Sequence, residues 1–172
     1  MQMKIALVVG TSRRHGNTWG LVEAANAELG LPVIDLSELA ISCFDYGAGN
    51  LADDFIPTVE KLLQFDSIGL VSPVYWYSVS AQMKIFIDRF SDLLGPRRDL
   101  LARLEGKGLF LLATGGTDPV LPQCMEDALR MTANYLQMRY HGSFYTLVEK
   151  DLAFAPGAIE GARAFLRSIG RG

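Results

Sequence analysis

The chain has 172 residues, of which 49% are hydrophobic, and its 19 acidic and 16 basic residues give a formal charge of −3. This length suits one domain, 1–172, and the near balance of charge gives no reason to expect a nucleic-acid or membrane partner. No apolar run approaches the ~20 residues of a membrane span, and the apolar start is too short for a signal peptide. Cys43 and Cys124 are too far apart in sequence for a metal-binding spacing. We therefore expect two buried thiols, no metal and a reducing, cytoplasmic setting.

The chain opens on a strand pattern that leads into a loop suited to a phosphate. Residues 3–9 predict a buried parallel strand, and residues 19–29 carry apolar positions at helical spacing. The loop Gly10–Thr18 thus lies at a helix N-terminus, where backbone N–H groups and the helix dipole favour an anion. Its side chains add hydrogen-bond donors, charge and tight-turn glycines: Ser12, Asn17, Thr18, Arg13, Arg14, Gly10 and Gly16.

An ordinary capped helix is the alternative interpretation of this loop. Asn17 or Thr18 would then be the N-cap, and both arginines would lie in solvent. The loop is neither a P-loop, because it lacks the Gly-Lys-Ser/Thr ending, nor a Rossmann turn, because it lacks the three glycines.

The next segment contains an irregular excursion between two strands. Residues 31–36 predict a short second strand, and the acids and glycines of residues 37–54 predict a surface loop. A helix begins near Asp53 and Asp54, and residues 66–71 predict the third strand.

A second notable loop, Ser72–Ser78, joins the third strand to a helix and holds three consecutive aromatic residues. Ser78 or Ser80 would cap that helix, which ends at Gly95 and Pro96. Its apolar face contains Met83, Phe86, Ile87, Phe90 and Leu94. The arginine-rich residues 97–103 predict a solvated connector.

A third loop, Thr114–Pro119, follows a fourth strand at residues 108–113. A helix at residues 121–135 and a fifth strand at residues 139–147 come next, and a last helix begins near Pro156. Two histidines lie outside any obvious acid–base pair: we expect His15 to be solvated and His141 to have a packing or surface role.

Five strands alternating with helices predict an α/β fold with a doubly wound parallel sheet in the order 2-1-3-4-5. Ligands of such sheets lie at the carboxyl ends of the strands where the winding reverses, which here is between strands 1 and 3. The three loops meet at that edge. One loop suits a phosphate, one is aromatic and one is a small Gly-Gly turn. Together they fit a ligand with a phosphate and a flat ring, such as FMN.

Three stretches in this order, Gly10–Thr18, Ser72–Phe90 and Ala113–Gly116, resemble the NADPH-dependent FMN reductase family, the flavodoxin-like group that includes the iron–sulfur flavoproteins. The resemblance covers nearly the whole chain. It implies FMN as cofactor, NADPH or NADH as donor, a small-molecule electron acceptor, and a flavin that carries the chemistry without a catalytic side chain. The candidate cofactor-binding residues are Thr11, Ser12, Arg13, Arg14, Gly16, Asn17, Thr18, Pro73, Val74, Tyr75, Trp76, Ser78, Thr114, Gly115 and Gly116.

The resemblance also implies a homodimer or a tetramer built from dimers, with the helix after the second loop at the subunit contact. The apolar Met83–Phe90 face, flanked by charged Lys84, Asp88 and Arg89, supports this expectation. The spacing of Lys84 and Asp88 suits either an ordinary helix pair or a pair between subunits.

One departure from the resemblance concerns cysteine. The iron–sulfur members carry a cysteine cluster after the second strand, whereas residues 41–46 keep only Cys43. One thiolate cannot hold a four-ligand cluster, so we predict a cluster-free flavin reductase.

Three other functions remain as alternatives. A flavodoxin-type electron carrier would typically be strongly acidic, with no arginines in its phosphate loop, and Arg13 and Arg14 argue against it. A phosphatase or nucleotide-binding protein would need a nucleophile loop or a carboxylate cluster, and neither is evident. A non-catalytic flavin-binding or scaffold protein stays open.

Overall fold

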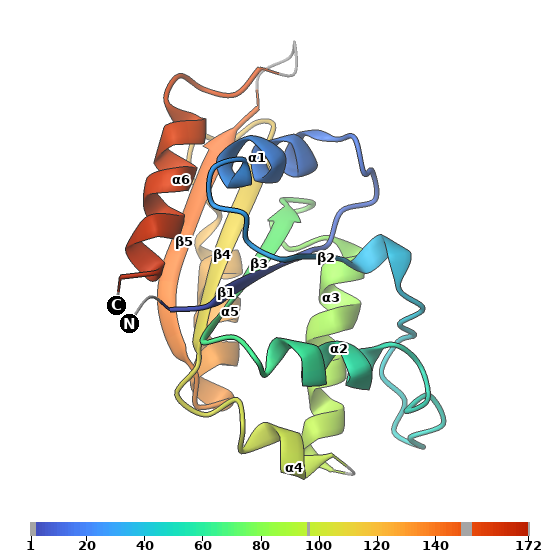
Figure 1. Ribbon diagram of the computed structural model, residues 1–172. Helices are drawn as coiled ribbons and strands as arrows, with labels where there is room; N and C mark the ends of the chain where they lie inside the picture. The colour runs from blue at the N-terminus through green and yellow to red at the C-terminus, as the bar shows by residue number, and fades with distance from the viewer. Residues whose placement is uncertain (1–2, 96, 149–152, 172) are drawn as a thin grey trace.

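The computed structural model describes residues 3–95, 97–148 and 153–171, in which strands and helices alternate (Figure 1). The strands are β1 Ile5–Val9, β2 Val33–Asp35, β3 Ser67–Pro73, β4 Gly108–Gly115 and β5 Arg139–Leu147. The helices are α1 Asn17–Asn26, α2 Phe55–Leu62, α3 Ala81–Asp88, α4 Arg98–Leu101, α5 Gln123–Tyr135 and α6 Ala158–Ile169. Two 3-10 turns, Leu36–Glu38 and Arg89–Leu94, follow β2 and α3.

All five strands are parallel and lie in the order β2-β1-β3-β4-β5, which confirms the predicted topology. The chain starts near the middle of the sheet, moves to β2 at one edge, and then crosses back over β1 to build the other side. The winding therefore reverses between β1 and β3, whose carboxyl ends pair at Val9 and Val71. The loops that follow β1, β3 and β4 leave this same edge of the sheet.

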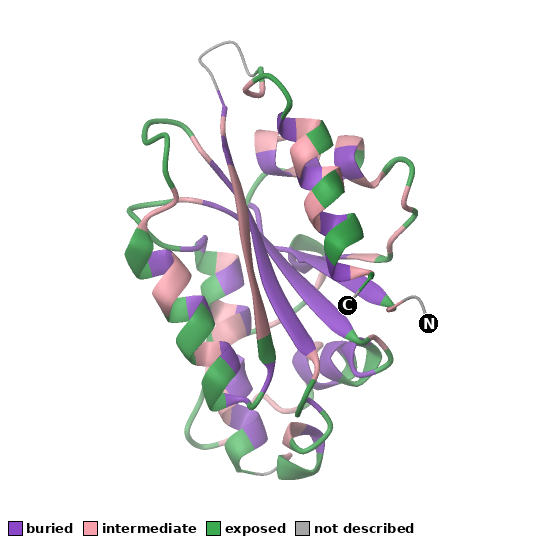
Figure 2. Cartoon of the chain, turned by 90° about the vertical axis from the view of Figure 1, so that its left-hand side faces the viewer, coloured by how far each residue is buried: buried purple, intermediate pink, exposed green. Residues whose placement is uncertain are grey.

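Helices cover both faces of the sheet because its strands are apolar on both sides. Ile5, Leu7 and Val9 pack against α1 and α6 on one face. Ala6 and Val8 point to the other face and join the core formed with α2, α3 and α5. Figure 2 shows the consequence, since the inner strands are almost wholly buried and the edge strand β5 is mostly half-buried.

Two strands are longer than the sequence pattern predicts. The pattern places the ends of the third and fourth strands at residues 71 and 113, but β3 continues to Pro73 and β4 to Gly115. Pro73 pairs with Thr114, so each strand is extended by its neighbour and not by its own apolar residues. β2 is shorter than predicted, and α6 begins two residues after Pro156.

The apolar face of α3 is buried inside the subunit, which is a correction to its predicted role at the surface. Met83, Phe86 and Phe90 belong to the core, where the Phe86 and Phe90 rings pack edge-on against Phe55 of α2. Of the charged residues beside this face, Lys84 and Asp88 form the ordinary helix pair at 2.6 Å.

Arg89 was expected among these surface charges but is fully buried. Its guanidinium pairs with Asp92 at 2.6 Å and with Asp53 at 2.5 Å, and it donates to the Ser42 carbonyl at 3.0 Å. It also lies over the ring of Phe55, 4.8 Å from the centroid. Arg89 therefore fastens the irregular 37–54 stretch to the body of the protein.

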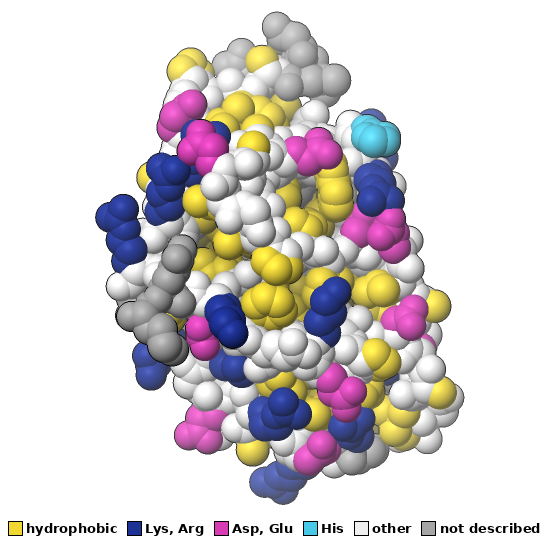
Figure 3. Space-filling view, viewed as in Figure 1, with side chains coloured by type: hydrophobic (Ala, Val, Ile, Leu, Met, Phe, Trp, Pro, Cys, Tyr) yellow, Lys and Arg dark blue, Asp and Glu magenta, His cyan; other side chains and the backbone are white. Residues whose placement is uncertain are grey.

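The charged residues are otherwise spread over the surface. Figure 3 shows acidic and basic side chains interspersed on one face, without a patch of a single sign. The 97–103 connector contains the short helix α4, and Arg97 pairs with Glu60 and Asp99 there. Among the described residues, no helix combines the length and apolar character needed to cross a bilayer.

Candidate functional site

The loop after β1 leaves the N-terminus of α1 without a side-chain cap. The N-cap is Gly16, in extended backbone, and no side chain of the described residues caps the first turn. The capped-helix alternative is therefore wrong, because Asn17 and Thr18 lie inside the helix. The hydroxyl groups of Thr18 and Thr114 instead lie 2.7 Å apart in a buried hydrogen bond. The first amides of a helix lack partners within it, so these groups are available to an anion.

The two arginines of this loop differ in their surroundings. Arg14 forms an ion pair with Glu38, lies 3.8 Å from the carboxylate of Asp35, and stacks over the ring of Trp19. Arg14 thus ties the loop to the segment after β2. Arg13 is exposed, and within the described part of the chain it forms no ion pair. Arg13 is consequently the guanidinium that is free to approach an anion.

The aromatic loop after β3 folds into a tight turn. The amide of Tyr75 donates to the Ser78 carbonyl at 2.9 Å, and the amide of Ser78 donates back to the Tyr75 carbonyl at 3.1 Å. Trp76 and Tyr77, at the tip, both have left-handed backbone, with φ of 48° and 64°. All three aromatic side chains are exposed. The turn therefore projects apolar rings from the carboxyl edge of the sheet.

The third loop begins at the end of β4 and is shaped by Tyr145 of β5. A Cβ on Gly115 would stand 2.1 Å from the Tyr145 hydroxyl, so only glycine fits under this ring. The hydroxyl donates to the Asp118 carbonyl at 2.5 Å and fixes the loop. Burial, with the nearby Asp118, raises the pKa of Tyr145. No local signal in the sequence points to Tyr145, because it lies far from this loop along the chain.

Ser80 holds the first and second loops together. Of the two serines predicted as caps of α3, Ser80 is the one used, since its hydroxyl accepts from the Met83 amide at 3.2 Å. The same hydroxyl donates to the Gly10 carbonyl at 2.6 Å. A Cβ on Gly10 would lie 2.7 Å from the Cβ of Met83, so the absence of a side chain allows α3 to pack against the loop.

A cavity of about 300 Å³ lies beside Ser12. The segment after β2 and helix α3 form its other walls, through Leu36, Ser37, Leu39, Ile41, Gln82 and Ile85. Ser12 therefore shares a recess with the segment after β2 and with α3.

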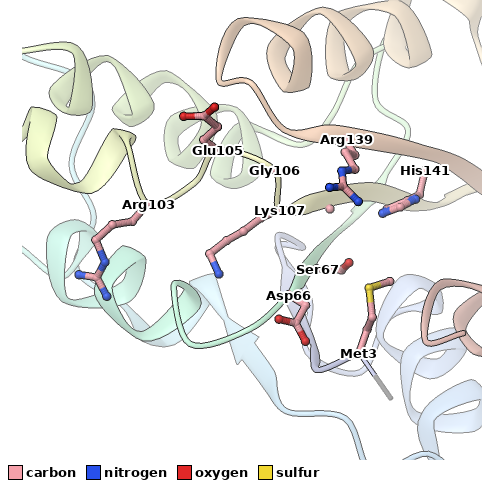
Figure 4. A pocket seen from close by; sticks show the side chains of 10 residues that line it. Met3, Asp66, Ser67, Arg103, Glu105, Gly106, Lys107, Arg139 and His141 are labelled. Carbon is pink, nitrogen blue, oxygen red and sulfur yellow. The ribbon is translucent and has the colours of Figure 1, made fainter. Parts of the chain in front are cut away.

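A larger cavity, of about 480 Å³, lies at the opposite edge of the sheet, where β3, β4 and β5 begin (Figure 4). Its charges are mixed, with Asp66 and Glu105 beside three basic side chains, and Lys107 already donates to the Phe65 carbonyl at 2.6 Å. His141 lines this cavity, where burial, with Arg139, lowers its pKa. This location keeps His141 away from the three loops and agrees with the packing or surface role expected for it.

Both cysteines are exposed, so the expectation of buried thiols is wrong. Cys124 lies at the start of α5, and its thiol donates to the Tyr77 carbonyl at 3.3 Å. Cys43 lies in the irregular stretch after β2. No group of three or more histidine, cysteine, aspartate or glutamate side chains gathers as a metal site in the described ranges.

The strand order and the three loops at the reversal of winding define a flavodoxin-like α/β protein. Its fold matches the solved structure of the Trp repressor binding protein from Bacillus subtilis, with a TM-score of 0.74, 26% identity, and coverage of 95% of this chain and 97% of that chain. The family model for NADPH-dependent FMN reductase matches residues 3–152, and the chain belongs to that family.

Two curated relatives agree with this assignment. The chain is 31% identical over 125 residues to YwqN of Bacillus subtilis strain 168, which is named an NAD(P)H-dependent FMN-containing oxidoreductase, covering 68% of this chain and 69% of that protein. It is also 31% identical over 130 residues to an iron–sulfur flavoprotein of Archaeoglobus fulgidus, covering 69% of this chain and 59% of that relative. The protein is accordingly an FMN-dependent NAD(P)H oxidoreductase by family.

The residues at the edge of the sheet fit the family's cofactor. FMN is a phosphate ester with a planar ring system, and the uncapped N-terminus of α1 beside Arg13 has the donors and the charge that a phosphate would require. Gly115 is covered by the Tyr145 ring, but Gly116 after it is open, since among the described residues no atom lies within 4 Å of the position its Cβ would take. A planar ring can approach such backbone closely.

Proposed function

We propose that FMN binds across the three loops, with its phosphate on the N-terminus of α1. The observation that carries this proposal is that no side chain in the described part of the chain caps α1, which leaves helix amides for an anion at the reversal of winding. The proposed phosphate contacts come from the first loop: Thr11, Ser12, Arg13, Arg14, Gly16, Asn17 and Thr18. Because Arg14 already pairs with Glu38, Arg13 makes the larger charge contribution.

The flavin ring lies, in this proposal, between the second and third loops. Its contacts are Pro73, Val74, Tyr75, Trp76 and Ser78 on one side and Thr114, Gly115 and Gly116 on the other. Pairing of Pro73 with Thr114 and the 2.8 Å bond from the Val74 amide to the Thr114 carbonyl keep the two sides at a fixed separation. This rigidity orients the ring without a large loop movement.

The reaction we infer is oxidation of NADPH or NADH with reduction of a small electron acceptor, such as free flavin, a quinone, or an azo or nitro compound. FMN, when bound, supplies the hydride-accepting chemistry. The protein binds the cofactor, orients it and shields one side of it from water. Hydride transfer needs no side-chain acid or base, which agrees with loops that hold no such pair. The enzyme is proposed to work without an iron–sulfur cluster.

The assembly we propose is a dimer, formed through an exposed apolar surface on α5 and the turn after α3. Met131 and Tyr135 of α5 are 64% and 70% exposed, and Leu94 is exposed beside them. They line a recess of about 360 Å³ with Ile87 and Phe90. A second copy of the chain would cover these side chains and remove their apolar area from water.

Comparison of FMN with riboflavin tests the phosphate site. FMN is expected to bind at least about tenfold more tightly, because riboflavin lacks the phosphate that the helix amides and Arg13 would contact. The Asn17→Ala and Arg13→Ala variants should weaken FMN and leave riboflavin almost unchanged, as measured by quenching of flavin fluorescence.

Arg103→Ala is the matched control, since Arg103 lines the cavity at the opposite edge of the sheet. It should leave both affinities at the wild-type values. Equal affinity for FMN and riboflavin in the wild type would remove the phosphate site from the proposal.

Turnover separates the enzyme from the electron-carrier alternative. The FMN-loaded protein should consume NADPH or NADH in the presence of an acceptor much faster than the same concentration of free FMN does. Nicotinamide oxidation no faster than that of free FMN would favour a carrier or a non-catalytic flavin-binding protein.

A further inference from the structure

We propose that the amino edge of the sheet holds a second binding site, for the phosphate group of a small molecule, built from Ser67, Arg139 and His141. These residues lie at the start of β3 and β5, around the cavity of about 480 Å³ shown in Figure 4. The three loops of the proposed flavin site leave the opposite edge of the sheet. The amino-edge site therefore serves a ligand other than FMN, and it does not depend on the proposed function.

The register of three parallel strands brings these residues together. Ser67 of β3 pairs with Gly108 of β4, and Gly108 pairs with Arg139 of β5. His141 follows two residues after Arg139, at the spacing that places two side chains on the same face of a strand. Both residues line the cavity. Three strands thus contribute to one small area at their amino ends.

Gly108 keeps open the space between Ser67 and His141. A Cβ at this position would overlap both the hydroxyl oxygen of Ser67 and Nε2 of His141. The two polar atoms therefore border the same point from neighbouring strands. Any other residue at position 108 would fill the space between them, so the absence of a side chain here preserves the site.

The hydroxyl group of Ser67 lacks a partner. Ser67 is fully buried, and no described residue forms a hydrogen bond with its hydroxyl group. A buried polar group without a hydrogen bond lowers the stability of a folded protein. An oxygen atom of a ligand, accepting from this hydroxyl, would remove that cost. Ser67 is thus a donor that the rest of the described chain leaves available.

Arg139 supplies positive charge to the same area. Its guanidinium is exposed and has no ion pair or hydrogen bond within the described ranges, while its backbone amide donates to the Lys107 carbonyl at 2.8 Å. Figure 4 shows the side chains of Arg139 and His141 next to each other above Ser67, whereas Glu105 points away from them. A guanidinium group binds phosphate oxygens through two parallel hydrogen bonds, which makes Arg139 the main anchor.

His141 adds a polar group that can adjust to the charge of the ligand. Burial, with the nearby Arg139, lowers the pKa of His141, so its imidazole is neutral at pH values near 7. An anion bound beside the ring would raise this pKa and favour the protonated imidazolium, which donates from both nitrogens. The site can thereby balance the second negative charge of a phosphate.

The overall charge of the cavity also favours an anion. Basic side chains outnumber acidic ones in its lining, which contains Arg103, Lys107 and Arg139 with Asp66 and Glu105. The carboxylate of Asp66 accepts from the Lys4 amide at 2.8 Å, which satisfies one of its oxygens. Donors that approach from three strands and several directions suit a tetrahedral phosphate group better than a planar carboxylate.

The cavity has more space than a phosphate group needs. Its volume of about 480 Å³ and the apolar side chain of Met3 in its lining leave room for a small organic part. Free phosphate and a phosphate ester offer the same group to Arg139. The volume favours the ester, so the experiment compares the two.

Imidazole NMR tests the site directly, because the chain has only two histidines, His15 and His141. The FMN-loaded protein is titrated with inorganic phosphate at about pH 7.5, against potassium chloride at equal ionic strength. We expect the His141 resonances to shift saturably, with a midpoint of about 1–10 mM phosphate. The His15 resonances should stay in place, because FMN already occupies the first loop.

Variants with matched changes of charge identify the residues involved. Arg139→Gln should raise the midpoint at least about tenfold, since it removes the charge-assisted hydrogen bonds. Ser67→Ala should raise it about threefold, through loss of one neutral donor. Arg130→Gln removes the same charge from α5, where Arg130 pairs with Asp127 outside the cavity, and should leave the midpoint unchanged.

Glycerol 3-phosphate in place of inorganic phosphate distinguishes the two sources of the group. A lower midpoint with glycerol 3-phosphate would identify an ester as the ligand, and equal midpoints would identify free phosphate. No saturable shift of His141 below about 50 mM of either probe, or a midpoint that Arg139→Gln leaves unchanged, would overturn the amino-edge site. If the protein fails to bind FMN, the proposed function fails, while the same titration of the flavin-free protein still decides this site.

Discussion

Gly10 controls how closely helix α3 approaches the first loop, Gly10–Thr18, where the phosphate is proposed to bind. Its missing side chain leaves room for Met83, and the Ser80 hydroxyl reaches the Gly10 carbonyl as a result. Both contacts fall at the boundary between the first and second loops. A single methyl group at this position therefore affects the geometry of the site as well as the packing.

Substitution of Gly10 by alanine is expected to destabilise the protein by about 1–3 kcal/mol and to weaken FMN binding, because the Met83 backbone and Cβ must move away. Denaturant unfolding and FMN titration measure the two effects. Gly20→Ala, in the interior of α1, is the control, since a Cβ there would meet a single atom of the described residues, in the Phe154 ring at 3.8 Å. It should raise stability by about 0.5–1 kcal/mol and leave FMN affinity intact.

At the scale of elements, the irregular 37–54 stretch is held by side chains more than by its own backbone. Arg89 is at the centre of this arrangement and contacts Asp53, Asp92 and the Ser42 carbonyl. The cavity beside Ser12 is walled partly by the same stretch, through Leu39 and Ile41. Loosening the stretch would therefore also open the recess beside the proposed phosphate site.

Replacement of Arg89 by methionine should cost about 3–5 kcal/mol, because it leaves the carboxylates of Asp53 and Asp92 without their buried partner. Urea unfolding measures this loss in the free energy of unfolding. Lys84→Met removes an exposed pair from the neighbouring helix and should cost at most about 0.5 kcal/mol. Similar losses in the two variants would contradict the central role of Arg89.

The Arg89 cluster also predicts how stability depends on pH. Burial alone would raise the pKa of Asp53, but hydrogen bonds from Arg89 and from the Ser42 and Phe55 amides outweigh it and lower the pKa to about 2. A depressed carboxyl pKa stabilises the folded state above the unfolded value of 3.8, and that contribution disappears as pH falls toward 2. The free energy of unfolding should decrease as the pH is lowered from about 5 to about 2, and it should decrease less steeply in Arg89→Met than in the wild type.

At the scale of the whole molecule, the dimer that we propose depends on the exposed apolar side chains of α5. Met131 and Tyr135 lie on the outer side of the helix, and Leu129 and Ala133 of the same helix are buried in the core. The proposed dimer thus centres on the side of α5 that the fold leaves uncovered, with Ile87 and Phe90 at its margin, whereas Met83 and Phe86 of the face suggested by the sequence are buried in the core.

Light scattering at about 10 µM, a concentration well above the Kd of a stable dimer, should give a dimer for the wild type. Met131→Asp with Tyr135→Asp should give a monomer, because two carboxylates would be buried without partners at the contact. Val120→Asp replaces an equally exposed apolar residue away from this surface and should remain a dimer. A wild-type monomer would reject the assembly.

The sheet order and the edge that holds the candidate site follow from local patterns in the sequence. Apolar runs such as residues 5–9 are local signals, and the handedness of parallel crossovers converts their order into a topology. The loops at Gly10–Thr18 and Thr114–Pro119 then meet, because the strands before them are close neighbours in one sheet. The fifth strand was predicted at its observed bounds for the same local reason.

Other features depend on residues that are far apart in sequence and meet in the folded protein. Arg89 resembles a surface charge in its own helix, and its burial follows from Asp53 and Ser42, 36 and 47 residues away in sequence. Position 115 requires glycine because the side chain of Tyr145, on the neighbouring strand, occupies the space that a Cβ would take. The left-handed turn at Trp76 and Tyr77 contradicts local preference, because contacts with β4 and α5 hold it. Local sequence patterns reflect the conformational preference of a segment by itself. Buried charge, close packing and backbone strain depend on which other parts of the folded chain contact that segment.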